Sequence, residues 1–207
     1  MARERTEREK AQRECADALS GVVKAVTTAM ESRDRHTAGH QGRVAEIACA
    51  IAVNMGWDGE QLQALEIAAL VHDVGKISVP AEVLTKPGKL TADEFAHIIV
   101  HPETGYQILK DIPFHWPIAE AVRQHHERLD GSGYPRGLKG DEILPMARIV
   151  AVADMLDAMV STRPYRTALP LEVALGELEL DAGTRLDAQV VKVCVDMLRD
   201  TPQPRSA

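Results

Sequence analysis

The chain has 207 residues, of which 45% are hydrophobic, so it can bury the core of one large globular domain. Its 24 basic and 31 acidic residues give a net charge of -7, which argues against long nucleic acids as general partners, and an anionic substrate would need a local basic pocket. The three cysteines are widely spaced, which argues against a disulfide framework or a CxxC zinc motif and fits a reducing cytoplasm.

The N-terminal segment, residues 1–30, is predicted to be a helix. It has no proline and no apolar signal-peptide core, and Leu19, Val23, Val26 and Met30 recur at helical spacing. Two interpretations stay open: a helix packed on its own domain, or a helix that mediates homodimerisation or transmits a signal from an upstream module. An oligomerisation measurement would separate them.

Helical periodicity continues through most of the remaining chain, and alternating strand patterns are scarce. Aromatic residues make up only 3% of the sequence, which also disfavours a large sheet. The expected fold class is therefore all-α. The predicted helices are 37–56, 59–72, 91–110 with a break before Pro102, 116–126, 145–160 and 170–200 in two pieces.

Most of the eight histidines stand near another histidine or a carboxylate. His36 and His40 are four residues apart, so on a helix both imidazoles project from one face, although a solvated face explains such spacing more often than a metal does. His72 and Asp73 end an apolar helix, where a buried carboxylate is costly unless it is paired or coordinated. The alternative is structural, with Asp73 capping a turn and His72 hydrogen-bonded in the core.

Asp154 poses the same cost, because it lies inside the strongly apolar helix 145–160. The charged residues of this helix also argue against a membrane span. Asp157, one turn later, is expected to face solvent. His97 and His115 lack comparable neighbours and are expected to be surface or packing residues.

The combined set of residues suits a metal centre. Mixed nitrogen and oxygen ligands favour a first-row transition metal such as iron or manganese over calcium. There are more histidines than one ion needs, which points to two ions with Asp73 able to bridge them. Such a centre binds hydroxide at neutral pH and stabilises a phosphoryl group during in-line attack. The candidate ligands are His40, His72, Asp73, His101, His125, His126 and Asp154.

Four motifs in this order carry a family resemblance: HDVGK at 72–76, HPETG at 101–105, HHERLDGSGYP at 125–135 and RPYR at 163–166. They resemble the HD-GYP domain, a branch of the HD superfamily of metal-dependent phosphohydrolases. The resemblance covers roughly residues 31–200, which leaves 201–207 as an expected flexible tail. It implies a helical bundle with a metal centre between helices. It also implies hydrolysis of the bacterial second messenger cyclic di-GMP to pGpG, and in some members on to GMP.

The resemblance also implies a role for each matching residue. The seven candidate ligands hold the metals, and Asp73 bridges them. Lys76 contacts the scissile phosphate or the attacking hydroxide, which makes it both catalytic and substrate-binding. The substrate cleft is bordered by Gly133, Tyr134 and Pro135, and phosphate is bound by Arg163 and Arg166. A guanidinium suits this role because its planar fork of donors matches phosphate oxygens.

Two features depart from the family pattern. His36 occupies a position that is aromatic or acidic in many members, and an acidic residue there accompanies a third ion. We therefore expect a binuclear site, with His36 as a candidate extra ligand for a third ion. The family usually carries an upstream receiver or sensory module, whereas only a short charged helix precedes this domain, so the chain is either a stand-alone domain or part of a longer protein.

The leading hypothesis is that a metal-bridging hydroxide attacks one phosphorus of cyclic di-GMP in line with the departing 3′ oxygen. One alternative is a non-catalytic domain that senses cyclic di-GMP or binds a partner protein through the loop of Gly133, Tyr134 and Pro135, the GYP loop. Another keeps the chemistry but changes the substrate to a different cyclic dinucleotide or a nucleoside phosphate. Incubation of metal-loaded protein with cyclic di-GMP decides between catalysis and sensing.

Overall fold

The computed structural model describes residues 21, 23, 25–28, 39–86, 88–162 and 167–200. Most of the predicted N-terminal helix, the RPYR motif at 163–166 and the tail at 201–207 lie outside these residues. Residues 25–28 are helical, Val23 belongs to the buried core, and the Thr27 hydroxyl lies 3.4 Å from the carbonyl oxygen of Leu70. The described end of the N-terminal segment therefore packs on its own domain. A further role in dimerisation or signalling stays a prediction.

The described residues form an all-helical bundle, as expected, and contain no strand, only two isolated β-bridges. The α-helices are α2 (His40–Asn54), α3 (Gly59–Val71), α4 (Ala81–Leu84), α5 (Ala92–Ile98), α6 (His101–Leu109), α7 (Ile118–Gln124), α8 (Pro145–Val160), α9 (Leu171–Asp181) and α10 (Ala188–Asp200). Two short 3₁₀ helices, η1 (Val74–Ser78) and η2 (Gly140–Glu142), complete the list. None of them is both long enough and apolar enough to cross a membrane.

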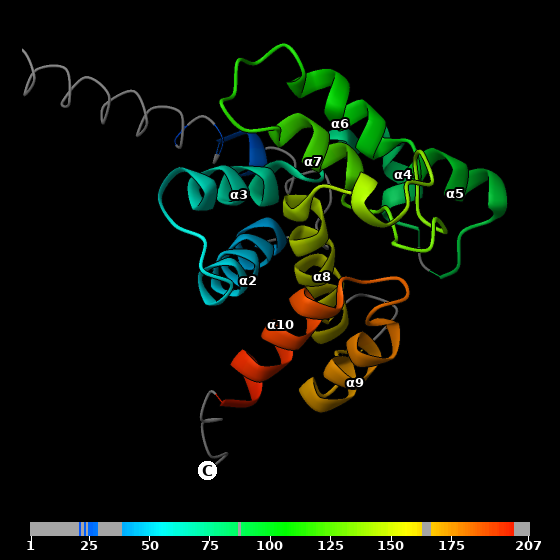
Figure 1. Ribbon diagram of the computed structural model, residues 1–207. Coiled ribbons are helices and arrows are strands. Elements are labelled where there is room, and N and C mark those ends of the chain that lie inside the picture. The colour runs from blue at the N-terminus through cyan, green and yellow to red at the C-terminus, as the bar shows by residue number, and fades with distance from the viewer. Residues whose placement is uncertain are drawn as a thin grey trace, which may run out of the picture.

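Helix α8 is the centre of the bundle (Figure 1). Ten of its sixteen residues are buried, and it packs against α2, α3, α7, α9 and α10. Helices α2 and α3 pack against each other on one side of α8, while α4 to α7 lie towards its N-terminal end (Figure 1). Because α8 contacts both groups, a polar side chain on its buried surface can meet residues from distant parts of the sequence.

The predicted helices are confirmed, with small changes at their ends. The break within 91–110 separates α5 from α6, and Pro102 stands in the first turn of α6, where its missing N–H leaves no hydrogen bond unmade. Helix α2 begins at His40 rather than 37, because Gly39 adopts a left-handed conformation with φ 71°. The sequence patterns did not reveal η1, η2 or α4, which are too short to show a periodicity.

Candidate metal centre

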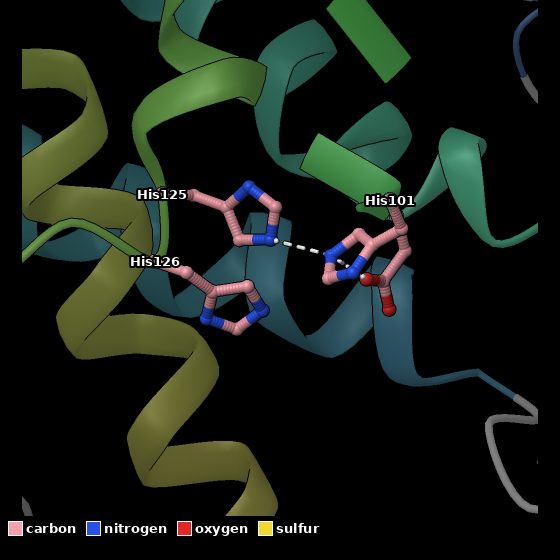
Figure 2. Close-up of side chains that lie close together, drawn as sticks. His101, His125 and His126 are labelled. Atoms are coloured by element: carbon pink, nitrogen blue, oxygen red, sulfur yellow. Dashed lines mark hydrogen bonds and ion pairs between the residues drawn. The ribbon is translucent and has the colours of Figure 1, made fainter. Parts of the chain in front are cut away.

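All seven predicted ligands meet between helices. His40 begins α2, His72 and Asp73 follow α3, His101 begins α6, and the adjacent histidines 125 and 126 follow α7. Asp154 reaches the same place from the middle of α8. Figure 2 shows the rings of His125 and His126 projecting from one stretch of chain towards His101. Five of the seven residues are buried, and His126 and Asp154 are partly buried.

Asp73 lies at the middle of the cluster, with its two carboxylate oxygens facing different histidines. Oδ2 lies 3.4 Å from Nε2 of His72 and 3.9 Å from Nε2 of His40. Oδ1 lies 3.3 Å from Nε2 of His101. Asp73 is therefore common to two groups of donor atoms, each compact enough to hold an ion: His40, His72 and Asp73, and Asp73, His101, His125 and His126.

Asp154 adds an oxygen to the first group. Its Oδ1 lies 3.2 Å from Nε2 of His40 and 3.9 Å from Nε2 of His72. In the second group, the Nε2 atoms of His101 and His125 are 3.2 Å apart. Two imidazole nitrogens at this distance, with an aspartate oxygen beside them, converge on one point.

The donor atoms fit divalent metal ions. Nε2 of His72 and Oδ1 of Asp73 are buried and have no hydrogen-bond partner among the described residues. A buried polar atom without a partner costs about 1–3 kcal/mol, which favours a ligand that satisfies it. Imidazole and carboxylate groups are ligands for zinc, iron, manganese and related ions. Asp73 is common to both donor groups, and its predicted role as a bridge between two ions stays a prediction.

Three of the histidines are oriented by the backbone at helix ends. Nδ1 of His72 lies 2.6 Å from the carbonyl oxygen of Ala69, and Nδ1 of His101 lies 2.8 Å from that of Ile98. His125 repeats the pattern with Val122 at 2.5 Å. In each case the carbonyl belongs to the last turn of the preceding helix, where it has no partner within the helix. A proton held on Nδ1 by this contact leaves Nε2 as the lone pair that faces the centre.

His40 is oriented by a side chain instead. Its Nδ1 lies 2.6 Å from Oδ2 of Asp157, which is only 1% exposed. The expectation that Asp157 faces solvent is therefore wrong. Helix α8 is covered on the side of Asp157 as well as on the side of Asp154, and the carboxylate enters the core paired with His40 and Arg43. A second aspartate one turn from Asp154 in an apolar helix was the available sequence signal, because burial there requires a charged partner.

The cluster shifts the pKa values of its members in opposite directions. Burial lowers the pKa of His40, but hydrogen bonds to Asp154 and Asp157 outweigh burial and raise it to about 9. Burial lowers the pKa of His126 to about 3, and burial with neighbouring histidines holds the pKa of His125 well below its usual value. Burial would raise the pKa of Asp73, but Lys76 and the histidines hold it well below the usual range.

Lys76 stands at the edge of the cluster. Its Nζ donates to Oδ2 of Asp73 at 2.6 Å, and its side chain is 24% exposed. It follows Asp73 by three residues through the 3₁₀ turn of η1, which is why the side chain reaches back to that carboxylate. The predicted place of Lys76 beside the donor atoms agrees with this contact.

The GYP loop closes over His126. The Tyr134 ring lies 4.8 Å from the His126 ring and 6.5 Å from the His101 ring, measured between centroids. Gly133 passes so close to the chain that a Cβ there would lie 2.4 Å from the amide nitrogen of Arg128. The bond between Tyr134 and Pro135 is cis. These contacts place the loop beside the second group of donor atoms.

Buried Glu127 holds this loop, a function that the sequence patterns did not reveal. Its carboxylate accepts hydrogen bonds from the amides of Arg136 at 2.7 Å and Leu138 at 3.0 Å. A glutamate directly after the two histidines was the only available signal.

The remaining predicted residues are of two kinds. His97 and His115 are exposed and lie outside both donor groups, as expected. His36, Arg163 and Arg166 lie outside the described residues, so their roles in metal and phosphate binding stay predictions.

A family model described as "HD domain" matches residues 24–190, which is most of the chain. The chain belongs to the HD domain family. The expected membership in the HD superfamily is thereby confirmed, and the histidine–aspartate centre of this HD domain lies within the matched residues.

Curated relatives of this HD domain are named as phosphodiesterases of cyclic dinucleotides. The cyclic di-GMP phosphodiesterase response regulator RpfG of Xanthomonas campestris is 42% identical over 82% of this chain and 44% of its own length. A cyclic di-GMP phosphodiesterase of Thermotoga maritima is 41% identical, over 90% of this chain and 51% of its own length. The 3′3′-cGAMP-specific phosphodiesterase 3 of Vibrio cholerae is 37% identical over 91% of this chain and 42% of its own length. The chain thus spans about half the length of these relatives.

Solved structures share the fold. Bd1817, an HDG"Y"P protein from Bdellovibrio bacteriovorus, has a TM-score of 0.68 and 23% identity over 90% of this chain and 63% of that chain. A cyclic GMP-AMP phosphodiesterase of V. cholerae, V-cGAP3, has a TM-score of 0.69 and 19% identity over 88% of this chain and 49% of that chain. At these identities the likeness supports the fold, which agrees with the all-helical bundle expected from the sequence.

Proposed function

We propose that this HD domain is a metal-dependent phosphodiesterase that hydrolyses cyclic di-GMP to pGpG. The observation that carries the proposal is the placement of Asp73, with Oδ2 facing His72 and Oδ1 facing His101, at the junction of two donor groups. A junction of this kind suits two ions held close together, which is the arrangement that phosphoester hydrolysis uses. The names of the relatives support a cyclic dinucleotide as substrate.

The two ions would be held by His40, His72, Asp73 and Asp154 on one side, and by Asp73, His101, His125 and His126 on the other. Bound there, they would activate water and neutralise charge on the nonbridging phosphate oxygens. Iron and manganese suit this mixture of imidazole and carboxylate ligands. A third ion would require a further ligand, for which His36 is the candidate.

The protein's own groups bind and orient the phosphodiester. Nζ of Lys76 is held at the rim of the cluster by Asp73, and its ammonium can donate to a phosphate oxygen there. Tyr134 lies beside His126, where the centre is less deeply buried, and Pro135 follows it through a cis bond. Arg163 and Arg166 follow α8 in the sequence and supply the positive charge that a dianionic substrate needs.

Two substrate classes compete under this proposal. The relatives at 42% and 41% identity are named for cyclic di-GMP, and the relative at 37% is named for 3′3′-cGAMP. The two molecules share the phosphodiester ring and differ in one base, so the centre can serve either. The higher identities favour cyclic di-GMP, and pGpG is the first product, with GMP as a further product if the linear dinucleotide is also cleaved.

The test uses protein stripped with a chelator and reloaded with Mn²⁺, or with Fe²⁺ under anaerobic conditions. Cyclic di-GMP and 3′3′-cGAMP are supplied separately, products are separated by chromatography, and bound metal is measured by elemental analysis. We expect pGpG from cyclic di-GMP at a higher rate than any product from 3′3′-cGAMP, with about two ions per chain. Binding of cyclic di-GMP by fully loaded protein without any product would contradict the proposal and support the non-catalytic sensor.

A further inference from the structure

His40 differs from the other oriented histidines in what holds it. His72, His101 and His125 each place Nδ1 against a backbone carbonyl. His40 places Nδ1 against the carboxylate of Asp157, from a helix 117 residues further along the chain. A carbonyl at a helix end can only accept a hydrogen bond, and no single substitution removes it. A carboxylate can be changed, and its own partners decide how it is oriented.

Asp157 is held by donors on both oxygens. Oδ1 accepts from Nε of Arg43 at 2.6 Å and from the Ser161 hydroxyl at 3.2 Å. Oδ2 accepts from Nη2 of Arg43 at 3.1 Å in addition to the 2.6 Å contact with His40. Nη2 of Arg43 also donates to the Ser161 hydroxyl at 3.2 Å. Asp157 therefore stands in one orientation, with Oδ1 facing Arg43 Nε and Oδ2 facing the imidazole.

The two aspartates of α8 lie at opposite nitrogens of one imidazole. Asp154 lies 3.2 Å from Nε2 of His40, and Asp157, one turn later, lies 2.6 Å from Nδ1. Nε2 is the nitrogen that belongs to the donor group with His72 and Asp73. An ion bound there requires the lone pair of Nε2, and this lone pair is present only if the ring's remaining proton stays on Nδ1.

We propose that Asp157 is a positioning residue that keeps this proton on Nδ1 of His40, and that Arg43 and Ser161, through Asp157, set the metal affinity of the His40–His72–Asp73 group. The inference rests on the two-ion centre of the proposed function. It assigns different controls to the two ion positions. One is adjustable through a side-chain network that includes Arg43, whose side chain is 44% exposed, whereas two histidines of the other, His101 and His125, are held by backbone carbonyls.

The isosteric substitution Asp157→Asn should invert the tautomer of His40. Apart from the imidazole, two donors face the Oδ1 position, Arg43 Nε at 2.6 Å and the Ser161 hydroxyl at 3.2 Å, and one, Arg43 Nη2 at 3.1 Å, faces the Oδ2 position, so the amide oxygen takes the Oδ1 place. The amide NH₂ then occupies the Oδ2 position and donates to Nδ1 of His40. Nδ1 must accept, the proton moves to Nε2, and the lone pair needed by the ion is lost. Replacing Arg43 by glutamine in the same chain removes the guanidinium donors, and the Ser161 hydroxyl that remains can accept as well as donate, so the amide can turn its oxygen towards His40.

The experiment compares wild type, Asp157→Asn, the double variant Asp157→Asn/Arg43→Gln and the control Asp187→Asn. Asp187 is a partly buried carboxylate paired with Arg148 at 3.1 Å, away from both donor groups. Each protein is stripped with a chelator and titrated with Mn²⁺. The number of bound ions, the affinity of each and the free energy of unfolding in urea are measured.

In Asp157→Asn we expect one ion to bind about 10- to 100-fold more weakly, which is the usual effect of losing an outer-shell partner, while the other binds as in wild type. The double variant should recover part of the lost affinity, and Asp187→Asn should bind both ions normally even if it is less stable. A merely structural Asp157 would weaken both ions together and make the double variant worse than the single one. That result, or two ions of wild-type affinity in Asp157→Asn, would overturn the inference. Failure of wild type to bind two ions would overturn the proposed function itself, and the inference with it.

Discussion

The two halves of the candidate metal centre are the two donor groups that share Asp73, and their histidines are supported in different ways. On the side of α2 and α8, His40 is held by Asp157, Arg43 and Ser161, which are side chains. On the side of α6 and α7, His101 and His125 are held by carbonyls of Ile98 and Val122. Backbone support comes with the helix itself and tolerates substitution. Side-chain support can be tuned by substitution, so metal affinity on the α2–α8 side is expected to vary more readily.

The halves also differ in charge. The α8 carboxylates raise the pKa of His40 to about 9, whereas burial lowers the pKa of His126 to about 3. Without metal, His40 is stabilised in its charged form and His126 in its neutral form. Asp73 is common to both halves, so its substitution should weaken both ions, whereas a substitution on one side should weaken mainly the ion of that side.

The largest effect is expected from Asp73→Asn, because this residue is common to both donor groups. An amide offers one oxygen and no charge, so metal content should fall on both sides and the phosphodiesterase rate should drop by more than about 10³-fold. Elemental analysis and a product assay measure the two effects. Asp196→Asn, an exposed carboxylate on α10, is the matched control and should behave as wild type. An Asp73→Asn protein with full metal content and full activity would contradict both the bridging role and the proposed function.

Lys76→Gln should separate substrate binding from metal binding. Loss of the ammonium beside Asp73 removes a charged donor from the phosphate, which should lower kcat/KM by about 10²-fold while the number of bound ions stays the same. Steady-state kinetics and elemental analysis are measured on the same preparation. Lys192→Gln, at an exposed i,i+4 pair on α10, should leave both unchanged. Metal loss in Lys76→Gln equal to that in Asp73→Asn would instead make Lys76 part of the support for the ions.

Gly75→Ala tests how the halves are joined. A Cβ at this position would lie 1.9 Å from the carbonyl oxygen of His101 and 2.6 Å from the amide nitrogen of Gly105. Helix α6 would have to move away from η1, which should cost about 3 kcal/mol of the free energy of unfolding and weaken binding on the His101 side. Urea denaturation and Mn²⁺ titration measure this. The control, Gly176→Ala in α9, meets nothing within 4 Å and should stabilise the protein by about 0.5–1 kcal/mol. Equal stability of the two variants would rule out the close packing.

The smallest effect concerns the pH dependence of metal-stripped protein. The pKa of His40 is raised, so its stabilising contribution is complete below pH 6.5 and is lost as the pH rises towards 9. The pKa of His126 is lowered, so its contribution is complete above pH 6.5 and is lost as the pH falls towards 3. Relative to wild type, His40→Gln should therefore be most destabilising near pH 6, and His126→Gln should be least destabilising near pH 5. Urea denaturation in a chelator across pH 5–9 checks both, and parallel curves for the two variants would show that the halves do not differ in charge.

The sequence predicted the helices and the seven residues of the cluster because these follow from local pattern. The long helices, α2, α3 and α8 among them, bury an apolar surface that appears as helical periodicity. The break before Pro102 follows from the chemistry of one residue. His72, Asp73 and Asp154 stood out because a buried polar group in an apolar helix needs a partner, and this reasoning does not depend on where the partner comes from.

What only the tertiary structure decided is which groups meet. Local pattern marked Asp154 as a buried carboxylate and assigned Asp157 to solvent, yet both contact His40, one at Nε2 and the other at Nδ1. The close approach of Gly75 to His101 likewise depends on how η1 packs against α6. Sequence alone therefore determined the helical class and the chemical types of the ligands, because burial and periodicity are properties of short segments. The pairing of oxygens with nitrogens, and hence the difference between the two halves, arises from contacts between segments far apart in the chain.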